Sequence, residues 1–430
     1  MKNKLKVITK NSFIKNVLMV ATGTAAAQIV KLLLTPIITR IYGPEAFGLL
    51  GVFMSIIIIM TPIAALTYPN AIVLPKLDSD AKGIARLSLY VTLFFSLVLF
   101  IIIILFNDSI ISIFALEEIS FMVYLIPIAI LFSGFSQIID QWIIRKKQFK
   151  FKARVTFYSS LFLDSSKISL GLINPLGTIL IAISVLGKAL NGLMIFVGLR
   201  KSGNIFIGEN NIKTIKKLAK NYKEFPIYRA PQLFINAVTQ GVPILMLSSM
   251  FGPASAGYYS LGRQILSVPS QLLGNSVGDV FYPRIAEAAS SRENLNNLIK
   301  KATLYLGLAG LIPYGIIVIF GPTIFSFLFG DEWFKAGEYA RWITLWIFFM
   351  LINQPSVKAL QVMSAQAFHL KFTILSLIIR FASLALGYLL YSSDIIAIAF
   401  FSVSGGILSF SLVIMTLKIS KNYDKENSAF

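Results

Sequence analysis

The sequence has no cysteine and one histidine, His369, which limits the chemistry that it can carry out. Without cysteine there are no disulfides, no thiolate catalysis and no cysteine metal sites. A single histidine removes most histidine-dependent catalysis and metal ligation. P-loop, HExxH and GxSxG motifs are also missing, so nothing indicates ATP hydrolysis or covalent catalysis. We therefore expect a protein that is not an enzyme and that has no cofactor and no metal.

Charged residues are also scarce, and apolar residues are correspondingly frequent. Charged residues make up 13% of the chain, against roughly a quarter in soluble domains, while hydrophobic residues make up 56%. The mean hydropathy is +0.76. Apolar residues come in long blocks such as Val98–Phe106 and Ile56–Met60. Crossing a bilayer takes about 20 apolar residues, and stretches of this kind recur along the whole sequence.

The sequence therefore predicts an all-α integral membrane protein with twelve transmembrane helices. The first six spans are expected at 17–39, 46–68, 84–106, 119–140, 153–173 and 176–199. The second six are expected at 225–250, 255–280, 302–321, 337–358, 369–391 and 394–417.

The net charge of +20 is distributed as a topology signal. With both termini in the cytoplasm, 29 of the 39 basic residues lie in inner segments, and two, Arg40 and Lys335, lie in outer loops. Basic residues collect on the cytoplasmic side of membrane proteins. The distribution predicts a multi-pass protein of the bacterial cytoplasmic (inner) membrane with N- and C-termini inside, in contact with membrane lipids. A nucleic-acid partner is not needed to explain the charge, and we expect none.

The chain repeats two short motifs with nearly the same spacing. Gly43–Gly48 (GPEAFG) recurs 209 residues later as Gly252–Gly257 (GPASAG). Val73–Leu77 (VLPKL) corresponds to Phe281–Ile285 (FYPRI), 208 residues later. Either motif alone could be a simple tight turn, but two in the same order favour a duplication. We expect a parallel repeat of two six-helix bundles, at 1–200 and 224–430, joined by a basic cytoplasmic loop at 201–223.

Several charged side chains fall inside the predicted spans, where a charge costs at least about 2.5 kcal/mol. Lys31 belongs to a polar stripe spaced by three or four residues, which places the stripe on one helix face: Thr24, Gln28, Lys31, Thr35 and Thr39. Span seven repeats the pattern, and the repeat aligns Lys31 with Gln240: Arg229, Gln232, Asn236, Thr239, Gln240 and Pro243. Span eight adds Arg263, Ser267, Ser270 and Gly274.

These stripes predict a cationic, water-filled cavity lined by Lys31, Arg263, Arg229, Gln28, Gln240 and Asn236. The alternative is snorkelling of long basic side chains to the headgroups, which explains Arg40, Arg341 and Lys358 and competes equally for Arg229. Asp164 and Lys167 are three residues apart and are expected to pair with each other. For Lys188 and Arg380, both the cavity and the snorkelling interpretation remain open. A cationic cavity implies an anionic substrate, with phosphate as the preferred group.

Three segments resemble one protein family: Thr35–Gly48, Ala71–Pro75 and Gly257–Ser260. They are similar to the bacterial polysaccharide flippases, the O-antigen and capsule repeat-unit translocases of the multidrug/oligosaccharidyl-lipid/polysaccharide exporter superfamily. The resemblance implies two six-helix bundles in a V around a central cavity. It also implies transport of an undecaprenyl-pyrophosphate-linked oligosaccharide between leaflets, with the polymerase and other polysaccharide-assembly proteins as partners. In relatives, basic residues on the first, second, seventh or eighth helices line the cavity. Here Lys31, Arg263 and Arg229 lie on matching helices, but span two has no basic residue in its middle.

Two other functions remain open at this point. A cation-coupled multidrug or metabolite exporter of the same superfamily would need buried carboxylates, and the mid-span acid here is Asp164, beside a lysine. A membrane glycosyltransferase or polysaccharide polymerase would need large outer loops, and the outer loops here are short.

Overall fold

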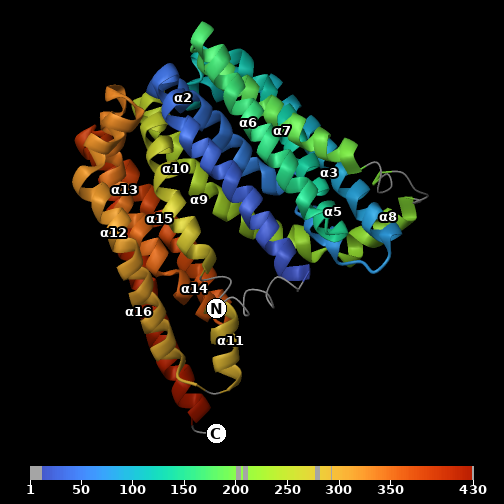
Figure 1. Ribbon diagram of the computed structural model, residues 1–430, viewed down its shortest axis with the longest axis vertical. Helices are drawn as coiled ribbons and strands as arrows, with labels where there is room; N and C mark the ends of the chain where they lie inside the picture. The colour runs from blue at the N-terminus through green and yellow to red at the C-terminus, as the bar shows by residue number, and fades with distance from the viewer. Residues whose placement is uncertain (1–11, 200–204, 207–211, 277–280, 292, 429–430) are drawn as a thin grey trace. The chain divides into compact units, whose positions relative to one another are not determined.

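A computed structural model describes residues 12–199, 205–206, 212–276, 281–291 and 293–428, with the side chains of 12–27 left aside (Figure 1). These residues form helices and no strands. Their contacts group into two compact units, Met1–Ala254 and Ser255–Phe430, and each unit is described by itself. The predicted division at 201–223 stays a prediction, and residues 201–204 and 207–211 of that loop lie outside the described part.

The first unit contains six long helices with shorter elements between them. The long ones are α2 (Ser12–Ala64), α3 (Asp78–Leu105), α5 (Leu125–Lys146), α6 (Phe149–Ile173), α7 (Gly177–Leu199) and α9 (Ala230–Phe251). The short α-helices are α4 (Asn107–Phe114) and α8 (Ile212–Asn221). Two 3₁₀ segments, η1 (Tyr68–Val73) and η2 (Glu117–Tyr124), and a π-helical turn, η4 (Phe225–Arg229), complete the unit.

The second unit contains five long helices and three short elements. The long ones are α10 (Pro253–Ser276), α12 (Leu295–Phe329), α13 (Phe334–Ile352), α15 (Gln366–Tyr391) and α16 (Asp394–Ser428). The short ones are α11 (Tyr282–Ser290), α14 (Gln354–Val362) and the 3₁₀ turn η6 (Asp331–Trp333).

Two glycines end helices where the GPxxxG motifs were found. Gly43 interrupts α2 with a φ of 64°, so α2 is two helices joined at a kink. Gly252 follows α9 with a φ of 86°. A positive φ is accessible to glycine without steric penalty, and the proline that follows each glycine suits the first turn of the next helix. Both motifs are therefore helix-to-helix corners, as a tight turn predicts.

Every predicted span has a counterpart among the described helices. Nine helices there are long and apolar enough to cross a membrane, and one of them, α2, supplies two predicted spans. The two remaining spans are α6 and α10, which are long enough but carry more polar and charged residues. The predicted all-α membrane fold is confirmed.

The ends of some spans were predicted less well than their centres. Helix α12 is longer than the predicted 302–321, and α16 continues beyond 417 to Ser428. The predicted span 337–358 is two elements, because α13 ends at Ile352 and α14 begins at Gln354. Apolar length marks the part of a helix inside the hydrocarbon, whereas the helix itself continues into the aqueous layer.

Helices α12 and α13 approach each other at two glycines. A Cβ atom added to Gly337 would lie 2.4 Å from the Cα of Pro322 and 2.5 Å from the carbonyl oxygen of Gly321. In return, a Cβ on Gly321 would lie 2.8 Å from the carbonyl oxygen of Gly337. The backbones are therefore in direct contact, as is common where small residues pack membrane helices together.

Candidate functional site

In the first unit, Lys31 lies on α2 at the point where the predicted polar stripe changes character. Gln28 and Lys31 are exposed, whereas Thr35 and Thr39 are buried. The Thr35 hydroxyl donates to the Lys31 carbonyl at 2.6 Å, and the Thr39 hydroxyl donates to the Pro36 carbonyl at 3.0 Å. Both threonine hydroxyls thus form their hydrogen bonds within their own helix. The side chain of Thr24 lies outside the described part of the chain.

Two charged side chains of α6 interact with Lys31. The Lys167 ammonium lies 2.8 Å from an Asp164 carboxylate oxygen, and the two side chains are 17% and 7% exposed. Both charges interact electrostatically with that of Lys31. The Tyr42 hydroxyl on α2 donates to the Lys167 carbonyl at 2.8 Å and so joins α2 to α6. The predicted Asp164–Lys167 pair is confirmed, and with Lys31 it forms a cluster with one net positive charge.

On α9, the amides of the predicted stripe form an exposed row at four-residue spacing, whereas Pro243 is buried and the stripe is not all on one exposed face. Gln232, Asn236 and Gln240 are all exposed, and the Arg229 guanidinium donates to the Gln232 side-chain oxygen at 2.8 Å. The opposite face packs on α2, where a Cβ on Gly241 would lie 3.1 Å from a backbone carbonyl oxygen. The amides therefore point away from the α2 contact, and Arg229 stands at the beginning of their row.

In the second unit, Arg263 shares an aromatic partner with another arginine. The Arg263 guanidinium lies 5.9 Å from the centre of the Trp346 ring, and the Arg380 guanidinium lies 3.8 Å from the same centre. The two arginines come from α10 and α15, and the tryptophan comes from α13. Attraction between a cation and an aromatic face is strongest when both are desolvated.

Arg380 is the better enclosed of the two. It is 6% exposed, and Phe401 of α16 lies 4.1 Å from its guanidinium carbon. Gly405 leaves space for it, since a Cβ there would lie 2.9 Å from Nε. Neither Nε nor Nη2 has a hydrogen-bond partner in the described part of the chain. Sequence reasoning left Arg380 open; the signal that marked it was an arginine in the middle of an apolar span.

Among the other enclosed charges of the described helices, the Nε of buried Arg86 in α3 also has no hydrogen-bond partner, whereas Lys188 and Asp394 do have partners. Lys188 of α7, also left open by the sequence, donates to the Ser133 hydroxyl of α5 at 3.1 Å. Asp394, at the start of α16, accepts hydrogen bonds from Tyr339 at 2.5 Å and Ser255 at 3.1 Å, and pairs with Lys335 at 2.6 Å. The described residues contain no group of acids and histidine that could hold a metal ion.

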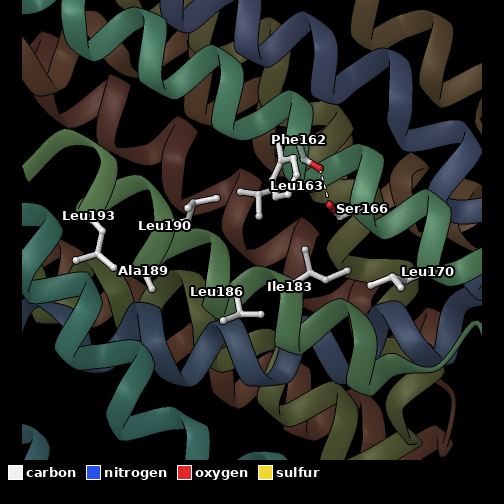
Figure 2. Close-up of a pocket in the computed structure, with 9 residues that line it drawn as sticks. All are labelled: Phe162, Leu163, Ser166, Leu170, Ile183, Leu186, Ala189, Leu190 and Leu193. Carbon is white, nitrogen blue, oxygen red and sulfur yellow. Dashed lines mark hydrogen bonds between the residues drawn. The ribbon is translucent and has the colours of Figure 1, made fainter. Parts of the chain in front are cut away.

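A groove of about 370 Å³ lies between α6 and α7 (Figure 2). Its lining is apolar apart from one serine: Phe162, Leu163, Ser166, Leu170, Ile183, Leu186, Ala189, Leu190 and Leu193. The Ser166 hydroxyl donates to the Phe162 carbonyl at 2.8 Å, so even this group is satisfied within α6. The groove contains none of the predicted site residues and offers nothing polar to a headgroup or a sugar.

The predicted site residues therefore fall into two sets. Lys31, Gln28, Arg229, Asn236 and Gln240 lie in the first unit on α2, η4 and α9, and all five side chains are exposed. Arg263 lies in the second unit, half-buried beside Trp346. The assignment of these residues to a substrate stays a prediction.

A family model described as polysaccharide biosynthesis protein matches residues 37–338. The chain belongs to this family. The match includes both GPxxxG corners, Arg229, the α9 amides and Arg263, while Lys31 precedes it.

Two curated relatives have related descriptions. The chain is 21% identical to the succinoglycan biosynthesis transport protein ExoT of Rhizobium meliloti (strain 1021) over 324 residues, which are 73% of this chain and 61% of ExoT. It is 26% identical to the amylovoran biosynthesis protein AmsL of Erwinia amylovora over 115 residues, which are 27% of this chain and 30% of AmsL. The matched region thus spans less than two thirds of either relative.

Two solved structures show the fold. A multidrug resistance MATE family transporter of the MOP superfamily, inward-facing, matches with a TM-score of 0.72 at 13% identity, covering 93% of this chain and 96% of that one. The lipid II flippase MurJ, inward closed, matches with a TM-score of 0.70 at 14% identity, covering 94% and 90%. The chain is thus a multi-pass membrane protein of polysaccharide biosynthesis with a transporter fold.

Proposed function

We propose that this chain is a flippase for lipid-linked oligosaccharides. It carries undecaprenyl-pyrophosphate-linked repeat units from the cytoplasmic to the outer leaflet of the bacterial inner membrane during O-antigen, capsule or exopolysaccharide synthesis. Family membership and the transporter fold support a transport role. The observation that carries the substrate class is the excess of cations over acids inside the spans, above all Arg380, which is buried without a hydrogen bond or ion pair among the described residues.

The proposed division of labour follows from the chemistry of the side chains. Lys31 offers a point charge and Arg263 a planar fork, and both suit the oxygens of a diphosphate. Gln28, Asn236 and Gln240 donate and accept hydrogen bonds, which suits sugar hydroxyls, and Arg229 adds charge at the end of their row. The polyprenyl tail stays in the lipid. Alternating access exposes the site to each side of the membrane in turn. The polymerase and other assembly proteins take up the product.

The sidedness of the stalled intermediate tests the function. Deleting the protein should leave complete repeat units on undecaprenyl pyrophosphate at the cytoplasmic face, unpolymerised. A synthesis defect would give truncated units, and a polymerase defect would give single units displayed outside. If finished units still reach the outer leaflet at the normal rate, with no second flippase present, the proposal is wrong.

Point variants test the cations. Lys31→Ala and Arg263→Ala should each abolish surface polysaccharide at unchanged protein level, and Lys31→Arg should keep part of it. The matched control is Lys421→Ala, which replaces an exposed lysine near the end of α16. Cells with this variant should export surface polysaccharide normally. Normal polysaccharide from both site variants would reject the assignment. Increased sensitivity to cationic drugs with normal polysaccharide would favour a multidrug exporter.

A further inference from the structure

Helix α8 is short, basic and strongly two-faced. Its lysines are Lys213, Lys216, Lys217 and Lys220, and their spacing of one, three and four residues places them within one arc of the helix. The apolar residues Ile215, Leu218 and Ala219 lie on the other side. A positively charged segment between two spans is expected of a cytoplasmic loop, but the topology rule does not require all its lysines to share one face.

The apolar face of α8 is occupied by the protein itself. Leu218 is 6% exposed and belongs to a buried cluster with Ile72 of η1, Trp142 of α5 and Ile205. The Tyr68 hydroxyl donates to the Ala219 carbonyl at 3.3 Å. The helix is therefore fixed on the first unit and cannot roll its apolar side into lipid. Its lysines stay exposed on the outside.

The lysines of α8 differ from other basic residues at this end of the unit. Arg145 and Lys146 both pair with Asp78, at 2.9 and 2.5 Å, and Lys152 pairs with Asp140 at 2.8 Å. In contrast, three lysines of α8 have no acidic partner among the described residues: Lys216, Lys217 and Lys220. Asp78 and Asp140 thus neutralise the basic residues of the neighbouring elements, whereas the lysine face of α8 keeps its positive charge.

The position of α8 indicates what this face meets. The helix packs on α3, which begins at Asp78, and on the cluster that includes the end of α5 near Lys146 (Figure 1). These are the ends of membrane spans, and the headgroup layer lies at the ends of spans. A rigid row of cations at that level is complementary to anionic headgroups.

We propose that Lys216, Lys217 and Lys220 form a docking surface for anionic phospholipid headgroups of the surrounding leaflet. Lysine at such a surface strengthens binding by roughly fivefold each, so three together strengthen it on the order of a hundredfold. The lipid holds α8, and with it this end of the first unit, against the membrane. This inference does not depend on which substrate the protein carries.

The test uses the full-length protein in neutral detergent, with dioctanoyl phosphatidylglycerol as the anionic probe and dioctanoyl phosphatidylcholine as the neutral one. Bound lipid is counted by native mass spectrometry at rising lipid concentration. The wild type should prefer phosphatidylglycerol. The variant K216Q/K217Q/K220Q should lose at least tenfold in phosphatidylglycerol affinity, with phosphatidylcholine binding unchanged, and K216R/K217R/K220R should keep its affinity.

The matched control is K300Q/K418Q/K421Q, which removes three exposed lysines from α12 and α16. It should keep phosphatidylglycerol affinity within about threefold of the wild type. If both triple variants lost phosphatidylglycerol affinity equally, the loss would be explained by the lower net charge alone, and the proposal would be overturned. Unchanged affinity in K216Q/K217Q/K220Q would also overturn it, and would leave an acidic protein segment as the ligand of this face. Because the altered side chains are exposed, thermal unfolding of the variants should match that of the wild type.

Discussion

The contact between α12 and α13 gives the sharpest test of the packing. Replacing Gly337 by alanine puts a methyl carbon 2.4 Å from the Pro322 Cα and 2.5 Å from the Gly321 carbonyl oxygen. Carbon atoms in ordinary contact are about 3.5–4.0 Å apart, so the helices must separate by roughly 1 Å. Neither obstacle is a flexible side chain that could rotate away.

Overpacking of this kind typically costs about 1–3 kcal/mol, and two backbone contacts place Gly337→Ala near 3 kcal/mol. The free energy of unfolding can be measured by titrating the purified protein with SDS in mixed micelles, followed by tryptophan fluorescence. Three of the tryptophans, Trp333, Trp342 and Trp346, lie at or in α13 and report directly on this region.

Gly315→Ala on α12 is the matched control, because a Cβ there meets nothing within 4 Å. Alanine is the better helix former, so this variant should be neutral or more stable by up to about 1 kcal/mol. The two alanine variants should therefore differ by about 3 kcal/mol. If they unfold within about 0.5 kcal/mol of each other, the backbone contact between α12 and α13 is not as described.

Three further outcomes are expected. Asp164→Asn should destabilise the protein by about 3–5 kcal/mol in the same titration, because it leaves the Lys167 charge unpaired, and adding Lys167→Met should restore most of the loss. Arg380→Met should leave the free energy of unfolding unchanged or raise it by about 1–3 kcal/mol, because the change removes an unpaired buried charge. The same variant should export less surface polysaccharide. A stable variant with normal export would contradict a functional role for Arg380. Gly330→Cys should react with an impermeant thiol reagent in intact cells and Ser202→Cys should not, and the reverse labelling would overturn the predicted orientation.

The spans could be predicted because their signal is local. Every backbone group inside the hydrocarbon must be hydrogen-bonded within its own helix, so an apolar run of sufficient length is a helix. The corners at Gly43 and Gly252 were visible for the same reason, since the conformation of a Gly-Pro step depends on adjacent residues. The Asp164–Lys167 pair was predictable because both residues lie on one helix, three positions apart.

The environment of the cations could not be predicted, because it is assembled from distant parts of the chain. Tyr42 and Lys167, which join α2 to α6, are 125 residues apart in the sequence. The enclosure of Arg380 needs Trp346 from α13 and Phe401 from α16. Polar spacing placed Lys31 and Thr35 on one stripe, but it could not show that Lys31 is exposed and Thr35 is buried.

The pairing inside α6 has a consequence for how the chain enters the bilayer during synthesis. Because Asp164 and Lys167 belong to one helix, α6 carries its own counterion as it leaves the translocon, and its insertion does not have to wait for a neighbour. Arg380 is different. Its cover comes partly from α16, which is made after α15, so a nascent chain that stops before Asp394 lacks the Phe401 side of the Arg380 enclosure. The enclosure of Arg380 is therefore completed only when the last helix is made.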